Sequence, residues 1–355
     1  MRTVGVEEEL LLVDTGSGEP AAAAPRLSGA TELEPELQRE QIEIGSSPVK
    51  GLAELRTELR ALRRSAAQQA ASVGAAVAAV GTAPGPVEAT TTDKARYHRM
   101  IERFAVIAED QLTCGCHVHV EVEDDEEGVA VLDRIRIWLP VLLALSANSP
   151  FWQGTDTRYA SFRNQAWNRW PGAGPTDIFG TAGRYHAAVR ALTSSETLLD
   201  DGMIYFDARL SGSYPTVEVR IADVCLHVDD AVLLAALSRG LVETAVHEWR
   251  ANLSPPEVRT ELLQVATWRA SRSGLSADLL SPLTLRPVPA PVAVGELVEH
   301  IARALDGLGD LTEVHELVTA LLARGNGAAA QRAAYSRRGR VEDVLSDAVD
   351  ATIAT

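Results

Sequence analysis

Five short segments of this chain place acids, histidines or an arginine where strand geometry would direct them to one place. They are Gly-Val-Glu-Glu-Glu at 5–9, Gln-Ile-Glu at 41–43, Cys-Gly-Cys-His-Val-His-Val at 114–120, the aromatic-rich run 151–180, and Thr-Val-Glu-Val-Arg at 216–220. Carboxylates and imidazoles buried on strands are costly unless positive charge compensates them. A divalent metal ion that carries a nucleotide is the simplest source of that charge.

The order of the predicted elements favours an α+β fold. Strand patterns at 3–13, 39–45, 114–122, 203–210 and 215–222 do not alternate regularly with helical patterns. The turn Ser-Gly-Ser-Tyr-Pro between the last two strands indicates an antiparallel pair. We therefore expect one central, mainly antiparallel sheet rather than a doubly wound parallel sheet.

Helical spacing of apolar residues predicts a long helix from Gly51 to Val80, which Gly81 and Pro84 would end. Further helices are expected at about 128–147, 182–199 and 229–252. The Pro-rich stretch 282–294 is the one linker-like break, and the helical part at about 295–355 is too small for an independent enzyme domain. We expect one domain covering 1–355.

Charge and cysteine content narrow the class of partner. With 33 basic and 49 acidic residues the net charge is −16, which argues against nucleic acid or an anionic membrane as partner. Three cysteines suit a reducing compartment, and neither a secretory signal nor a membrane-spanning stretch is recognisable. We expect a soluble cytoplasmic protein, for which a homodimer is permitted but not required.

Strand alternation separates the charged side chains from the apolar ones. Glu7 and Glu9 would point one way, and Glu8 would point to the core side. Glu218 and Arg220 share a face opposite an apolar stripe. These charged faces form either a polar site or a solvent-facing sheet with cross-strand salt bridges.

The Cys-Gly-Cys-His-Val-His segment resembles a zinc site in composition but not in geometry. Cys114 and Cys116 face one side of the strand, whereas His117 and His119 face the other, so the four side chains cannot converge on one tetrahedral ion. We expect the cysteines in the core and the histidines beside the acids. Carboxylates with one histidine and no thiolate suit Mg²⁺, or Mn²⁺, better than structural zinc.

Arg220 is poorly placed for a bare metal among these acids but well placed for a phosphoryl oxygen. The chain has neither the Gly-x-x-x-x-Gly-Lys-Ser/Thr motif nor the Gly-x-Gly-x-x-Gly motif, so nucleotide binding would use neither a P-loop nor a Rossmann turn.

The run 151–180 lacks periodicity and holds seven of the 17 aromatic residues of the chain, together with Arg158, Arg163 and Arg169. Such a segment suits a pocket that binds the carboxylate of an amino acid, or a lid that excludes water. The alternative is an Ω-loop packed on its own aromatic side chains.

These five motifs, in this order, resemble the carboxylate–amine ligase family, the type 2 glutamate–cysteine ligases, which are related in fold to glutamine synthetase. The similarity runs from about residue 3 to Leu275, with a weaker echo at 325–332. The resemblance implies a curved antiparallel sheet whose concave face holds Mg²⁺ and ATP, with helices packed on its convex side.

The resemblance also implies roles for individual residues. The implied metal shell is Glu7, Glu9, Glu43, His117 and Glu218, with His119 beside it as a cofactor contact. Arg220 would meet the transferred phosphoryl group, with Glu43 and Glu218 as its catalytic neighbours. The implied substrate-binding residues are Arg158, Tyr159 and Arg163. The implied nucleotide-phosphate or carboxylate contacts are Arg269, Arg272 and Arg332.

The implied reaction phosphorylates a carboxylate with ATP, after which an amine displaces phosphate to form an amide. Glutamate and cysteine are the default substrates. One departure bears on them: relatives often have Gly-Thr-His-Pro where this chain has Gly-Thr-Ala-Pro at 81–84, so Ala83 lacks an imidazole. The alternatives are a ligase for another acid and amine, a metal-dependent amidohydrolase, and a non-catalytic binding protein on the same scaffold.

Overall fold

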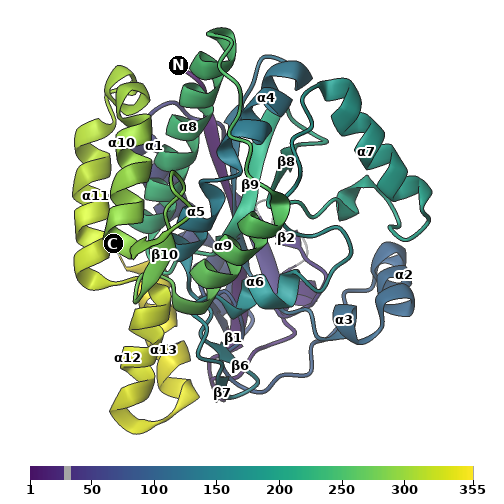
Figure 1. The fold of residues 1–355 in the computed structure, drawn as a ribbon. Coiled ribbons are helices and arrows are strands. Elements are labelled where there is room, and N and C mark those ends of the chain that lie inside the picture. The colour runs from purple at the N-terminus through teal and green to yellow at the C-terminus, as the bar shows by residue number, and fades with distance from the viewer. Residues whose placement is uncertain (28–32, 355) are drawn as a thin grey trace.

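The computed structural model describes residues 1–27 and 33–354 and is built around one seven-stranded sheet (Figure 1). The strand order is β2-β3-β1-β5-β9-β8, and β4 also pairs with β1; every pairing is antiparallel. The strands are β1 Val4–Asp14, β2 Glu34–Pro35, β3 Gln41–Gly45, β4 Ala75–Ala78, β5 Gly115–Glu121, β8 Ala208–Leu210 and β9 Thr216–Asp223. The predicted α+β class with a mainly antiparallel sheet is confirmed.

One face of the sheet is covered by a thick layer of helices, most of which lie on the left of Figure 1. They include α1 Leu52–Ser72, α4 Asp125–Ile135, α5 Leu139–Ser146, α8 Val228–Arg250, α10 Ala290–Leu308 and α11 Leu311–Arg324. Helix α8 packs on β1 and β5 with one side and on α10 and α11 with another, which is why most of its side chains are buried. The main hydrophobic core lies in this layer.

The opposite side of the sheet carries fewer and shorter helices. These are α2 Ala95–Phe104, α3 Val106–Glu109, α6 Phe162–Trp167 and α7 Ala182–Ser194, and Figure 1 shows α2, α3 and α7 on the right. Between these elements and the sheet lies a cavity of about 640 Å³. Among the described residues, no helix combines the length and the apolar character needed to cross a membrane.

The remaining elements surround the sheet. They are the 3-10 helices η1 Ala24–Leu27 and η2 Asp201–Met203, the hairpins β6 Phe151–Trp152 with β7 Thr155–Asp156 and β10 Asp278–Leu280 with β11 Pro287–Pro289, and the helices α9 Thr260–Ser273, α12 Gly327–Arg338 and α13 Val341–Ile353. Helix α13 returns to the sheet: the Thr352 hydroxyl accepts a hydrogen bond of 2.8 Å from the Ala79 backbone amide beside β4.

Several predicted boundaries are wrong. The helix predicted to reach Val80 ends at Ser72, because the chain turns at Gly74 with a φ of +74° and then pairs with β1 as β4. The helix predicted at 128–147 is two helices, and Pro140 stands in the first turn of the second, where its missing N–H costs nothing.

The segment 151–180 contains the β6–β7 hairpin and α6, so the prediction of an irregular run is wrong in part. The strand predicted at 203–210 is reduced to β8, and η2 occupies its start. Helices α2 and α3 were not predicted, because only Met100 of α2 and Ala108 of α3 are buried, which leaves little apolar periodicity.

Glu8 points to the helical side of the sheet, where it forms an ion pair with Arg63 of α1. The Arg63 Nη2–Glu8 Oε1 distance is 2.6 Å and the Nε–Oε2 distance is 2.8 Å, and both side chains are fully enclosed. Arg63 also donates to the carbonyls of Cys225 and Leu226. This bidentate pair satisfies the one acid that β1 sends into the core.

We predict that Arg63→Met lowers the free energy of unfolding by about 3–5 kcal/mol, because it leaves the Glu8 carboxylate buried without a partner. Urea denaturation measures the change. The matched control is Arg337→Met, which removes a bidentate but half-exposed pair with Asp347 and is expected to cost far less stability. Equal losses in the two variants would contradict the structural role given to Glu8 and Arg63.

Candidate active site

The cavity on the open side of the sheet is floored by charged side chains from four adjacent strands. Strand pairing places Glu7 opposite His117, Glu9 opposite Glu43, and His119 opposite Glu218. With Arg220, these side chains line the cavity. The structure therefore brings together all the residues of the implied metal shell, along with His119 and the arginine expected at the phosphoryl group.

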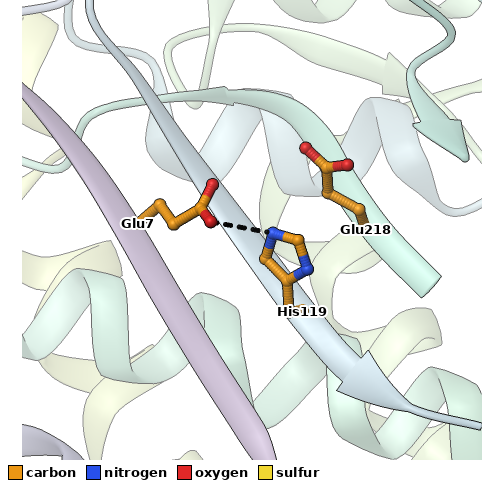
Figure 2. Close-up of side chains that lie close together, drawn as sticks. All are labelled: Glu7, His119 and Glu218. Atoms are coloured by element: carbon orange, nitrogen blue, oxygen red, sulfur yellow. Dashed lines mark ion pairs between the residues drawn. The ribbon is translucent and has the colours of Figure 1, made fainter. Parts of the chain in front are cut away.

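Figure 2 shows the imidazole of His119 on β5 between the carboxylates of Glu7 on β1 and Glu218 on β9. His119 Nε2 lies 3.3 Å from Glu7 Oε1, and His119 Nδ1 lies 2.9 Å from the Thr216 hydroxyl. His117 Nδ1 lies 3.4 Å from Glu7 Oε2, whereas its Nε2 has no hydrogen-bond partner among the described residues although the ring is buried. A buried nitrogen without a partner is available to a ligand.

Three overlapping groups offer donor atoms that lie within 4.8 Å of one another. The groups are Glu7, His119 and Glu218; Glu7, Glu43 and His117; and Glu9, Glu36 and Glu43. Glu36 was not predicted, because it lies outside the predicted strands and reaches the site through the β2–β3 pairing next to it. Each group is of a size that could hold a divalent cation.

The electrostatics at the two ends of the floor differ. Burial, with Glu36 beside it, raises the pKa of Glu9 to about 7, and burial with Glu36, Glu7 and Glu9 raises the pKa of Glu43 well above its usual range. Burial and the charge of Arg220 lower the pKa of His117 to about 4, so its imidazole is neutral at pH 7. Glu9 and Glu43 therefore hold protons more tightly than ordinary carboxyl groups, because the described residues around them do not fully compensate the charge of their ionised forms.

Glu218 is compensated by two arginines. Arg209 Nε lies 2.7 Å from Glu218 Oε2, and Arg220 pairs with Glu218 Oε1. Burial opposes ionisation, but Arg220 and Arg209 prevail and hold the pKa of Glu218 at about 2. Arg209 was not among the predicted site residues. It lies opposite Glu218 in the predicted hairpin, so pairing of opposite charges across the two strands could have identified it.

The β5–β9 pairing is interrupted beside Arg220. Cys116 and Val118 on β5 face Ala222 and Val219 on β9, so β9 has one extra residue between them. Such a bulge bends the strand and re-aims a side chain, here next to Glu218. Regular alternation could not predict it. Cys114 and Cys116 are buried free thiols in the core, as expected.

Aromatic side chains from the run 151–180 form a wall of the cavity. Trp167 and Trp170 line it, and both pack against Tyr205, with ring centroids 4.8 Å and 5.7 Å apart. The guanidinium of Arg220 lies 5.9 Å from the Trp167 ring centroid. This wall shields the arginine from solvent on that side.

Arg163 lies beside the cavity without lining it. Its side chain is buried, and its Nη2 would be 2.2 Å from a Cβ at Gly115, so only glycine leaves room for it. Its backbone amide donates to Ser149, which with Ser161 donates to the buried carboxylate of Asp223. Arg163 thus belongs to a network that joins the aromatic segment to the end of β9.

The other arginines expected at the site do not line the cavity. Arg332 pairs with Asp156 at 2.8 Å and donates to the Tyr159 carbonyl, while Arg272 donates to the Arg158 carbonyl and lies 5.6 Å from the Tyr159 ring centroid. These five residues, Asp156, Arg158, Tyr159, Arg272 and Arg332, form a separate cluster outside the cavity.

Two further predicted positions also lie outside the cavity. Arg269 is partly exposed on α9 and does not line the cavity. Ala83 is buried beside a smaller cavity that Trp152 also lines.

A family model for glutamate-cysteine ligase family 2 (GCS2) matches residues 3–347. The chain belongs to this family. Proteins of Streptomyces avermitilis and Streptomyces coelicolor, named "Putative glutamate--cysteine ligase 2-1" and "Putative glutamate--cysteine ligase 2", are 51% and 50% identical to it over 360 residues and match 99% of both chains. Membership of GCS2 confirms the predicted enzyme class, a carboxylate–amine ligase.

Solved structures support the fold of this GCS2 protein. A glutamate–cysteine ligase of Francisella tularensis, determined in complex with AMP, has a TM-score of 0.73 at 12% identity and covers 99% of this chain and 88% of its own. A bifunctional glutathione synthetase of Pasteurella multocida has a TM-score of 0.71 at 13% identity, covering 99% of this chain and 52% of its own. At such low identity the likeness establishes the fold.

We predict that Glu43→Gln stabilises the protein in the absence of divalent cations, because it removes one of three crowded carboxylates. A gain of roughly 1 kcal/mol corresponds to about 2–4 °C in melting temperature. If these groups hold a cation, Mg²⁺ or Mn²⁺ will raise the melting temperature of the wild type and raise that of the variant far less. The control is Glu316→Gln, an exposed acid on α11. Equal responses in Glu43→Gln and wild type would rule Glu43 out as a ligand.

Proposed function

We propose that this ligase joins the γ-carboxylate of glutamate to the amine of cysteine, using ATP with Mg²⁺, or Mn²⁺, and an acyl-phosphate intermediate. The observation that carries the proposal is the convergence of Glu7, Glu43, His117 and Glu218 around Arg220 on one face of the sheet. The choice of substrates is supported by the names of the relatives, and the choice of nucleotide by the neighbour determined with AMP.

The donor set fits Mg²⁺. Carboxylate oxygens dominate it, the histidines are the other donors, and Cys114 and Cys116 lie in the core rather than at the site. The unpartnered Nε2 of His117 and the crowding of Glu9, Glu36 and Glu43 are costs that a bound cation would offset. When bound, the metal would neutralise phosphate charge and orient the phosphates.

The residues of the chain would position and shield the reactants. An oxygen of the substrate carboxylate attacks the terminal phosphorus of ATP and ADP leaves; the amine then attacks the acyl carbon and phosphate leaves. Arg220, fixed by Glu218 and by the Trp167 ring, would balance charge on the transferred phosphoryl group. The wall of Trp167, Trp170 and Tyr205 would limit hydrolysis of the acyl phosphate by water.

We predict that ADP release from ATP and Mg²⁺ requires both an acid and an amine. Glutamate with cysteine should give a product with the mass of the dipeptide, in which an amide bond joins the two amino acids. A panel of amino acids and simple amines, tested singly and in pairs with mass detection, measures this. An amide from another pair would keep the ligase and change its substrates. Amide hydrolysis without nucleotide turnover would favour the amidohydrolase alternative.

We predict that the double change Glu7→Gln with Glu218→Gln lowers ligase turnover by at least about 10³-fold, because it removes the carboxylates on either side of His119. Circular dichroism checks that the fold survives. Glu316→Gln serves again as the control with unchanged turnover. Substantial activity in the double variant would overturn the assignment of this face of the sheet as the site.

A further inference from the structure

Arg96 of α2 stands at the rim of the cavity in a half-exposed ion pair. Its Nε and Nη2 lie 2.8 Å and 2.9 Å from the two carboxylate oxygens of Asp200, next to η2. The side chains of Arg96 and Asp200 are 35% and 39% exposed. Tyr97 and Met100 of the same helix also line the cavity, so α2 supplies a polar and apolar rim.

The three arginines that line the cavity, among the residues the structure describes, differ in how firmly they are held. Arg209 and Arg220 both pair with the buried Glu218, so drawing either guanidinium group toward a ligand would break a buried ion pair. Water screens the half-exposed Arg96–Asp200 pair, so this pair contributes little stabilising free energy. An incoming carboxylate could therefore replace Asp200 with a small loss of free energy. Arg96 is therefore the arginine of the cavity free to exchange partners.

Arg96 and Arg220 both lie near Tyr205, and all three side chains line the cavity. Burial raises the pKa of Tyr205, and the positive charges of Arg96 and Arg220 both oppose that rise, which places both guanidinium groups near the phenol. Tyr205 packs on Trp167, whose ring faces Arg220. At Gly202, a Cβ would lie 2.9 Å from Asp200 Oδ1 and 3.1 Å from Arg96 Nη2, so glycine there leaves room for the pair.

We propose that Arg96 binds the second carboxylate of a dicarboxylic amino acid whose reacting carboxylate lies at Arg220 and the acidic floor. Asp200 holds the guanidinium group until the substrate replaces it. The two parallel N–H donors of a guanidinium group suit the carboxylate of Asp200 and that of the substrate equally. The inference rests on the proposed ligase function and deepens it, because it assigns the recognition of a dicarboxylic acid, over a monocarboxylic one, to one residue.

The test compares glutamate with 4-aminobutyrate, which keeps the γ-carboxylate and the amine but lacks the α-carboxylate. Arg96→Gln is expected to raise KM for glutamate roughly 10- to 100-fold, as for the loss of a charge-assisted pair, with little change in kcat. KM for 4-aminobutyrate should not change, so the preference for glutamate collapses. Arg96→Lys, which keeps the charge without the fork, should fall between.

Two further variants separate recognition from a structural role. Asp200→Asn breaks the same ion pair but frees Arg96, so KM for glutamate should stay level or fall. Arg337→Gln removes the bidentate pair with Asp347 away from the cavity and should change neither constant. If Arg96→Gln and Asp200→Asn raise KM equally, or if the preference for glutamate survives in Arg96→Gln, the inference is overturned.

Calorimetry without ATP keeps the inference testable if no pair of substrates turns over, an outcome that would count against the proposed function alone. The wild type should then bind glutamate more tightly than 4-aminobutyrate, and Arg96→Gln should abolish the difference. Equal binding of the two compounds by the wild type would overturn the role of Arg96, whatever reaction the site performs.

Discussion

The buried ion pair between Glu8 and Arg63 sets the side-chain pattern of the central strand, and the site depends on that pattern. Glu7, Glu8 and Glu9 are consecutive, so a slip of one residue in the pairing of β1 would exchange their faces. Such a slip would remove Glu8 from Arg63 and bury two carboxylates without partners. The ion pair on the helical side of the sheet thereby determines that Glu7 and Glu9 face the cavity on the other side.

The sheet handles its acids in two physically different ways. Glu8 and Glu218 are buried in ion pairs with arginines, which compensate the charge of both carboxylates. Glu9 and Glu43 face each other and Glu36 with too little positive charge nearby. The fold therefore tolerates local repulsion at the cavity floor, where a cation can relieve it, and avoids repulsion elsewhere on the same strand.

The part of the site that follows from alternation along strands was predictable, and the part that depends on tertiary placement was not. Alternation placed Glu7 with Glu9, and Glu218 with Arg220, on the polar face of their own strands without knowledge of the fold. Glu36 and Arg96 come from segments with little periodicity that other elements hold in place. The predicted first helix extends beyond Ser72 because the alanines and valines that follow are compatible with a helix and with a buried strand. Pairing of Ala75–Ala78 with β1 makes this segment a strand.

The hydrogen bond between Ala79 and Thr352 ties β4, the partner of β1, to a residue 273 positions later in the chain. At roughly 5–20 residues per second, synthesis of that interval takes on the order of 14–55 s. During that time the nascent chain holds β4 without the helix that covers this amide. The last strand of the sheet, β9, ends at Asp223, so every strand is synthesised well before the helix that closes the edge beside β4.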